Sequence, residues 1–445
     1  MILFIIFTIL AAGFFYLFIR DKKHQFSPLW LMLSTWMLGL GIPQLHLSEL
    51  EKDWYPAFWL LLIVSLCMFV LGFYIFDRVI IKVSRHPELV SGSQTRFRNK
   101  FGMTKIFSDN DINAKRLRIV VYGLFIISLV GLALFRLKAG NLPLLAPDTD
   151  VFRFVADEQV PGLINYAAQF ARLFIPLSFF LFFWQGFSLR KHWDLSLIGI
   201  IGIISLTLFA SRTQIFFVDL WVMALYLLMR KPNLKQALKF YPVFLLISVL
   251  VLAAVPFYRQ YKSYGSADYL AGVTSINSSG YNVGAKALLP IYVGVSFNQQ
   301  ALLHAYEYYQ THPIQQGRVS LDPFTNLFGK VIPGLNNLKS DFDLCAIFKC
   351  WWNTGTYLFP FVQDFGTKAF VFAPFVFAGI FAALWHYWKI SPNFLSINLY
   401  AYAMFFIVMT VYLSFTVRAE MYLDLMLLVA SYLFVSKLSI SNSYE

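Results

Sequence analysis

The stretch "SLTLFASRTQIFFVDLWV", residues 205–222, decides whether a long apolar run of this chain is one helix or two. From Leu195 to Met229 the residues are almost all aliphatic or aromatic, yet Arg212 interrupts them. A guanidinium at the centre of a bilayer costs roughly 2.5–3.5 kcal/mol even on translocon-insertion scales. The run therefore predicts two helices that meet at "SRTQ" (residues 211–214), with Arg212 at the tip of a helical hairpin.

The composition predicts an all-α integral membrane protein. Of the 445 residues, 58% are hydrophobic and only 13% are charged, whereas soluble proteins have about 25% charged residues. The apolar runs are continuous rather than alternating, which favours helices over a barrel. The first run has no basic leader and no small-residue cleavage site, so we expect it to remain as a helix. Eleven runs could each span a bilayer: 2–19, 28–48, 56–76, 119–136, 165–184, 195–210, 215–229, 241–257, 368–387, 396–414 and 421–437.

The distribution of charge orients these runs. The net charge of +13 alone would allow a nucleic-acid partner, but the basic residues gather in alternate short loops, as the positive-inside rule predicts. The basic loops are 20–24, 77–118, 190–192 and 230–239, and the acidic ones are 48–54 and 146–159. We therefore expect the N-terminus and "SRTQ" on the outer side, the C-terminus in the cytoplasm, and no nucleic-acid partner.

Two long loops interrupt the single polytopic domain, residues 1–445. The cytoplasmic loop 77–118 contains "SRHPELVSGSQTRFRNKFGMTK", which looks like the translated product of a mobile DNA element; it is otherwise an ordinary basic loop, and neither interpretation gives it a role in chemistry. The outer loop 258–355 is far longer than usual helix connections, and such loops are usually functional. Within it, residues 263–284 should be irregular, while "VSFNQQALLHAYEYYQ" (295–310) has helical spacing.

The three cysteines fall into two groups. Cys67 is expected to be buried in the third helix. Cys345 and Cys350 lie in the outer loop, in an oxidising compartment where a short-range disulfide can form. Two free thiols are equally compatible with this spacing, because connectivity cannot be deduced from sequence.

Arginines gather at the predicted outer ends of the helices. A guanidinium binds phosphate oxygens through two parallel hydrogen bonds and stays charged in a low-dielectric setting, so the cluster predicts an anionic ligand such as a diphosphate-linked lipid in the bilayer. The alternative for each arginine is a snorkelling anchor or the partner of a carboxylate. The candidate diphosphate-binding residues are Arg153, Arg172, Arg212, Arg259, Arg318 and Arg418.

Candidate acid–base residues lie near the same surface. Asp364 and Glu420 adjoin helix ends, and His304 and Glu307 share a face of the predicted loop helix; each could accept a proton from a sugar hydroxyl. A local ion pair with Arg418 is the alternative for Glu420. No histidines have metal-ligand spacing and no nucleotide-binding motif is present. We therefore expect no metal and no cofactor, and a substrate that is already activated.

Several segments resemble the oligosaccharide repeat-unit polymerases, the O-antigen polymerase (Wzy-type) family of bacterial inner-membrane enzymes. They are "GNLPLLAPDTDVFRF" (140–154), "FASRTQIF" (209–216), "GKVIPGL" (329–335) and "NTGTYLFPFVQDFGTKAFVFAPFVFAGIF" (353–381), within a resemblance that covers about 119–435. The segment 318–329 also fits the R-x10-G spacing of some of these polymerases, although a companion R-x15-G is not evident in the earlier outer loop.

The resemblance implies a GT-C-like membrane glycosyltransferase. Such an enzyme joins undecaprenyl-diphosphate-linked repeat units on the periplasmic side, releases undecaprenyl diphosphate without a metal, and works with a chain-length regulator. The arginines would then hold the diphosphate, and Asp364, Glu420 or the His304–Glu307 pair would deprotonate or orient the acceptor. The alternatives are an O-antigen ligase, which should need a loop histidine, and a glycolipid flippase or other transporter, which usually shows two related halves. An O-acyltransferase would need a histidine deep in the membrane, and none is present.

Overall fold

The computed structural model describes residues 1–84, 112–186, 191–232, 234–329, 332, 334–340, 344–349, 352 and 354–436. The described chain is helical, and its only β-pairings are two isolated bridges. It divides into two compact units. The first consists of Met1–Lys82, Pro232–His386 and Ala403–Leu423, and the second consists of Val83–Lys231, Tyr387–Tyr402 and Asp424–Glu445.

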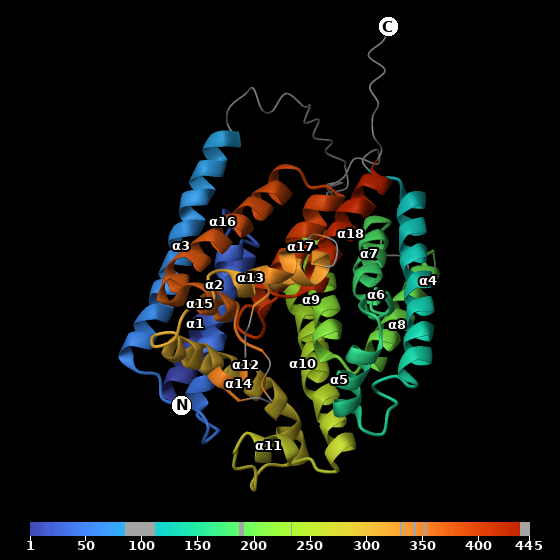
Figure 1. Ribbon diagram of the computed structural model, residues 1–445. Coiled ribbons are helices and arrows are strands. Elements are labelled where there is room, and N and C mark those ends of the chain that lie inside the picture. The colour runs from blue at the N-terminus through green and yellow to red at the C-terminus, as the bar shows by residue number, and fades with distance from the viewer. Residues whose placement is uncertain are drawn as a thin grey trace. The chain divides into compact units, whose positions relative to one another are not determined.

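The first unit combines the N-terminal helices with the long outer loop and the helices after it (Figure 1). Its larger helices include α12 (Val283–Tyr308), which lies within the predicted loop and contacts α2 (Pro28–Gly41), α10 (Leu234–Tyr264) and α15 (Leu358–Phe365). The elements assigned mainly to this unit are α1 (Ile2–Arg20), α2 (Pro28–Gly41), η1 (Ile42–Leu45), α3 (Pro56–Ser84), α10 (Leu234–Tyr264), α11 (Tyr269–Val273), α12 (Val283–Tyr308), α13 (Arg318–Phe328), η3 (Leu335–Leu338), α14 (Leu344–Ile347), α15 (Leu358–Phe365), η4 (Gly366–Lys368) and α16 (Ala369–Ile390).

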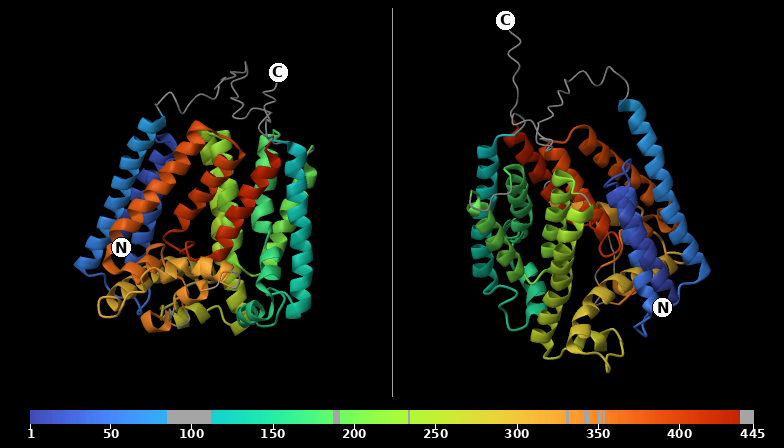
Figure 2. Two further views of the ribbon diagram at one scale, coloured as in Figure 1. Left: turned by 45° about the horizontal axis from the view of Figure 1, so that its top comes forward. Right: turned by 180° about the vertical axis from the view of Figure 1, so that it is seen from behind.

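The second unit is built around helices that lie side by side (Figure 2). Its principal contacts join α4 with α6 and α7, and α7 with α8 and α9. Two C-terminal helices, α17 (Phe394–Met409) and α18 (Ala419–Val435), continue from one unit into the other. The remaining helices of this unit are α4 (Ala114–Ala139), α5 (Thr149–Gln159), α6 (Gly162–Ala168), α7 (Ala171–Trp184), α8 (Trp193–Leu208) and α9 (Arg212–Arg230).

Helices overlap all eleven apolar runs, and several apolar helices indicate a multi-pass membrane protein. Within the described residues, six helical stretches are long and apolar enough to cross a bilayer by themselves. They are Ile2–Arg20, Pro56–Lys82, Ala114–Ala139, Gly162–Trp184, Arg212–Arg230 and Leu358–Ile390, while Trp193–Leu208 and Phe394–Met409 are shorter apolar helices. Eleven spans therefore stay a prediction.

Local signals explain several helix boundaries. Pro28 occupies the start of α2, where its missing N–H costs nothing. Asn113 caps α4 by accepting hydrogen bonds from the backbone N–H groups of Lys115 (3.0 Å) and Arg116 (3.2 Å). Gly140 ends the same helix in the left-handed region, at a φ of 78°. The predicted loop 77–118 is consequently shorter at both ends than expected, because α3 extends to Ser84 and α4 begins at Ala114.

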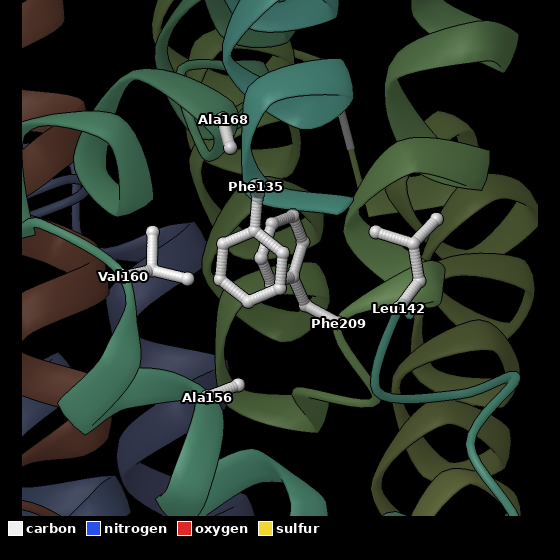
Figure 3. Packing of buried hydrophobic residues seen from close by; sticks show 6 residues of the cluster. All are labelled: Phe135, Leu142, Ala156, Val160, Ala168 and Phe209. Carbon is white, nitrogen blue, oxygen red and sulfur yellow. The ribbon is translucent and has the colours of Figure 1, made fainter. Parts of the chain in front are cut away.

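The predicted hairpin at "SRTQ" is confirmed in the second unit. The helix α8 ends at Leu208, and α9 begins at Arg212. Figure 3 shows the ring of Phe209, just before the turn, against the ring of Phe135 from α4; their centroids lie 5.0 Å apart in an edge-to-face arrangement. Leu142, Ala156, Val160 and Ala168 complete this buried cluster, which brings the turn and the predicted outer segment 140–160 together.

The first unit also joins segments predicted to share one side of the membrane. Residues 46–53, from the loop after η1, pair with the segment before α12: Ser48 forms an isolated bridge with Ile276. Glu51 accepts a 2.5 Å hydrogen bond from the hydroxyl of Tyr292 on α12. The side chain of Gln300 bonds to both backbone groups of Lys52. The N-terminal loop therefore packs directly onto the long outer loop.

The outer loop is more ordered than its sequence predicts. The expected helix at 295–310 is confirmed, but α12 begins at Val283 and is largely buried. The segment 263–284, expected to be irregular, contains the end of α10, the short helix α11, the bridge residue Ile276 and the start of α12, with turns and irregular backbone between them. The expectation for Cys67 was wrong, because its side chain lies on the exposed face of α3. The possible inserted element of loop 77–118 lies largely outside the described residues.

Candidate functional site

A cavity of about 350 Å³ lies in the first unit and is lined by three segments that are distant in sequence. The helix α13 forms one wall, the start of α15 with the residues before it forms the second, and the loop between α17 and α18 forms the third. The lining residues are Val319, Asp322, Asn326, Thr354, Gly355, Phe359, Pro360, Gln363, Leu413, Ser414, Val417 and Arg418. Two of these walls belong to the predicted motifs 318–329 and 353–381.

Asn298 of α12 connects two of the walls. Its Nδ2 donates to the carbonyl oxygens of Gly294 and Tyr412, and its Oδ1 accepts from Trp352 Nε1 (3.1 Å) and Thr354 Oγ1 (2.8 Å). The side chain is fully buried, so these four bonds satisfy an amide that would otherwise be costly to desolvate. One residue of the outer loop thus fixes the backbone at Tyr412 and the side chain at Thr354.

Asp364 holds the helix α13 in place. Its Oδ1 accepts from the backbone N–H of Val319 (3.0 Å), and its Oδ2 accepts from the N–H (2.8 Å) and the hydroxyl (2.5 Å) of Ser320. These donors lie in the first turn of α13, where N–H groups lack partners within the helix. The next turn requires Gly366, whose φ of 60° and ψ of −141° fall in a region that only glycine adopts readily. The aspartate and the glycine of "DFG" (residues 364–366) therefore each have a structural role.

Two buried or half-buried polar side chains of the cavity have no protein partner within the described part of the chain. Gln363 is 0% exposed, and neither its Oε1 nor its Nε2 makes a hydrogen bond there. Arg418 is half-buried, and among the described residues its guanidinium meets no carboxylate, Glu420 included. Asp322 is different, because both its oxygens accept from the N–H and hydroxyl of Ser340. The cavity thus offers an uncommitted cation, an oriented carboxylate and a buried, uncommitted amide.

Arg172, a predicted diphosphate ligand, lies instead in a buried ion pair of the second unit. Its Nε is 2.9 Å from Asp424 Oδ2 and 3.1 Å from Oδ1, and the two residues are 2% and 0% exposed. The hydroxyl of Tyr166 donates to Asp424 Oδ1 at 3.0 Å, and the guanidinium lies 4.7 Å from the centre of the Tyr166 ring. The sequence analysis did not select Asp424. A carboxylate within the apolar run 421–437 could have indicated a buried partner for an arginine.

The other predicted arginines occupy separate elements. Arg153 lies on α5, and Arg212 is the first residue of α9; both are half-buried and belong to the second unit. Arg259 lies on α10, and Arg318 is the exposed first residue of α13, next to the cavity residue Val319. Only Arg418 of the six predicted arginines lines the cavity.

The predicted acid–base residues also lie on different elements. His304 and Glu307 do lie together on α12, with 3.8 Å between His304 Nδ1 and Glu307 Oε2. Glu307 is engaged more closely by Lys52, at 2.9 Å. Burial lowers the pKa of His304, and the charge of Lys52 lowers it further. Glu420 is a half-buried residue in the first turn of α18. The four predicted acid–base residues all lie outside the cavity lining: His304, Glu307, Glu420 and Asp364. Asp322, which the sequence analysis did not select, does line it.

The cysteines of the described chain are in different states. Cys345 is disulfide-bonded and Cys67 is free, which favours the disulfide alternative for the outer loop; Cys350, the expected partner, lies outside the described residues. Within the described chain, no group of three or more His, Cys, Asp or Glu side chains has an arrangement suited to a metal ion.

No protein-family model, curated protein sequence or solved structure matches this chain.

Proposed function

We propose that this protein is a metal-independent membrane glycosyltransferase that joins lipid-diphosphate-linked oligosaccharide repeat units, as the O-antigen polymerases do. The observation that carries the proposal is Arg418 in the cavity wall, half-buried and without a carboxylate partner in the described part of the chain. Burying a cation without a partner is unfavourable unless an anion compensates it. The same cavity is walled by 318–329 and 353–381, two segments that resemble the polymerase family.

In the proposed reaction, an acceptor hydroxyl oxygen attacks the anomeric carbon of the donor glycan. A C–O bond forms there as the bond from that carbon to the diphosphate oxygen breaks, and undecaprenyl diphosphate leaves with both electrons of the broken bond. Negative charge develops on the leaving diphosphate, and a preorganised guanidinium stabilises that charge as it grows. We assign this role to Arg418, with Arg318 at the neighbouring end of α13 as an additional attraction for the anion.

The acceptor hydroxyl must also lose its proton. We assign the general base to Asp322, because its carboxylate lines the cavity and its orientation is fixed by the two donors of Ser340. Glu420 is the next candidate, since it follows Arg418 by two residues. Asp364 holds the first turn of α13 through both its oxygens, so it acts in this scheme by positioning a wall of the cavity.

The proposal extends to the cellular setting. The multi-pass chain would reside in the bacterial inner membrane, with the cavity on the periplasmic side, and a chain-length regulator would be its protein partner. These assignments follow from the charge distribution and the family resemblance.

The test is polymerisation in vitro by the purified full-length protein. A short repeat unit linked to undecaprenyl diphosphate is incubated with wild type, Arg418→Ala and Arg418→Lys, in a chelator and without nucleotides, and products are separated on a gel. A ladder from wild type that is lost with Arg418→Ala is the expected result. With lipid A core added, transfer of a single unit without a ladder would favour a ligase. With the protein reconstituted in vesicles, transport of the lipid-linked unit without any new glycosidic bond would favour a flippase.

A further inference from the structure

Gln363 is unusual among the polar residues of the first unit. It follows the first helical turn of α15, contributes to the cavity wall, and is 0% exposed. Both polar atoms of its amide lack a hydrogen-bond partner in the described part of the chain. Gln299 on α12 is equally buried and equally unpartnered there, but it does not line the cavity. The two residues therefore differ in that only Gln363 belongs to the wall of the cavity.

An amide in this position selects for a particular kind of ligand. A buried donor or acceptor without a partner costs about 1–3 kcal/mol, so a ligand that supplies the missing partners gains that free energy. The amide offers two donors on nitrogen and an acceptor on oxygen. A phosphate, which only accepts, would leave the acceptor oxygen unsatisfied. Adjacent hydroxyl groups both donate and accept, and they match the amide fully.

The surroundings of Gln363 limit the size of that ligand. The cavity of about 350 Å³ lies near the lower end of the range of small-molecule sites, about 300–1,000 Å³. The aromatic side chain of Phe359 and the ring of Pro360 line it beside Gln363. Gly355 allows the wall to close, because a Cβ there would lie 2.5 Å from the Phe359 ring. One sugar ring fits these limits better than a glycan chain does.

We propose that Gln363 hydrogen-bonds to two hydroxyl groups of a single sugar ring and thereby determines which sugar the cavity accepts. In the polymerase, we assign that sugar to the acceptor glycan. This assignment rests on the proposed polymerase function, whereas the binding of a neutral sugar by Gln363 does not. In that scheme Arg418 would bind the diphosphate of the donor, and Gln363 would recognise an uncharged sugar of the acceptor.

The experiment measures binding of neutral sugars without any lipid or phosphate. The full-length protein in detergent is titrated with the methyl glycosides of glucose, galactose, mannose, rhamnose and N-acetylglucosamine, and Kd is obtained by saturation-transfer difference NMR. At least one glycoside should bind wild type. Gln363→Met, which keeps the length of the side chain and removes the amide, should raise that Kd at least about tenfold, because a site built around a hydrogen bond discriminates strongly. The matched control Gln299→Met should leave it unchanged.

Thermal unfolding separates recognition from folding. Gln363→Met removes a buried amide without a protein partner, so its Tm should equal or exceed that of wild type. If this variant does not fold, Gln363→Asn, which retains the amide but withdraws it by one methylene, should fold and raise the Kd in the same direction. An unchanged Kd in a folded Gln363 variant, an equal loss with Gln299→Met, or no binding of any glycoside to wild type would each overturn the inference.

The outcomes also separate this inference from the proposed function. A product ladder together with an unchanged Kd for Gln363→Met would leave the polymerase intact and remove the role of Gln363. Sugar binding that depends on Gln363, without any polymerisation of lipid-linked substrate, would retain the inference and remove the polymerase.

Discussion

Arg172 and Arg418 are both arginines from the predicted diphosphate-binding set, yet their surroundings differ. Arg172 is buried against Asp424 and covered by Tyr166. Arg418 is half-buried in a cavity wall and has no carboxylate partner in the described residues. A buried arginine with a fixed counter-ion stabilises a fold or fixes a packing arrangement, whereas one that meets a cavity can receive an anion from outside. The partner of the charge, rather than its depth, therefore distinguishes the two roles.

The largest expected effect is on the buried pair. Asp424→Ala leaves the Arg172 charge buried without its counter-ion, and removing one partner of such a pair typically costs 3–5 kcal/mol. We therefore expect a marked loss of stability, measured by thermal unfolding in detergent. The double variant Arg172→Met with Asp424→Leu should recover most of the loss, because it removes both charges. A stable Asp424→Ala protein would contradict a structural role for this pair.

The next effect is on activity rather than stability. Arg418→Ala should lower the rate of polymerisation by about 10²–10³-fold, which is typical for the loss of one group that stabilises developing negative charge. Its Tm should stay close to that of wild type, because the guanidinium has no counter-ion to abandon. Arg418→Lys should restore part of the rate, since it keeps the charge but not the planar fork. If Arg418→Ala lowered the Tm as much as Asp424→Ala does, Arg418 would have a structural role like that of Arg172.

Asp364 provides a smaller and sharper test. The carboxylate of Asp364 accepts hydrogen bonds through both oxygens, whereas in Asp364→Asn one oxygen becomes an NH₂ group that cannot accept from Val319 or Ser320. The variant should therefore be destabilised by about 1–2 kcal/mol, as for the loss of a helix cap. Polymerisation measured below the lowered Tm should continue. Complete inactivity with an unchanged Tm would instead assign Asp364 to catalysis, as the sequence predicts.

The smallest effect concerns the pH dependence of stability. Burial raises the pKa of Glu51 from 4.5 to about 7, although the hydrogen bond from Tyr292 lowers it. The folded protein binds this proton more tightly than the unfolded chain does. The resulting stabilisation is present below about pH 4.5 and is lost as the pH rises through about 7.

Glu51→Gln should abolish that dependence. Relative to wild type, the variant should gain roughly 1 kcal/mol between about pH 5 and about pH 8, less than the full shift because Glu51 is only partly shielded from water. Chemical unfolding at several pH values measures the difference. Parallel stability curves for the two proteins would show that Glu51 does not titrate in this range.

The sequence predicts the helices of this protein well because apolar length is a strong signal. The interruption at Arg212 correctly marks the turn between α8 and α9, and helices overlap every predicted apolar run. The burial of α12 was harder to predict from the sequence. Its residues Ser296, Asn298 and Gln299 are fully buried, although their polar character is typical of a loop. Tertiary packing, rather than local composition, keeps these residues out of water.

The candidate site was predicted only in part, for a related reason. The motifs 318–329 and 353–381 do form two walls of the cavity, and Arg418 does line it. Asp322 and Gln363 lie within those motifs but were not singled out, because an aspartate in a loop and a glutamine near a helix end are common. Their significance comes from Ser340 in one case and from a missing partner in the other, and neither is visible in a linear sequence.

The bonds made by Asn298 and Trp36 have a consequence for biosynthesis. Asn298 bonds to the backbone of Tyr412, 114 residues later, and the indole N–H of Trp36 donates to Thr410, 374 residues later. A nascent chain still on the ribosome at residue 400 contains the whole outer loop but neither of these partners. The walls of the cavity can close only after the end of the chain has been made and inserted, so truncated products should lack an organised cavity even when every earlier helix is in place.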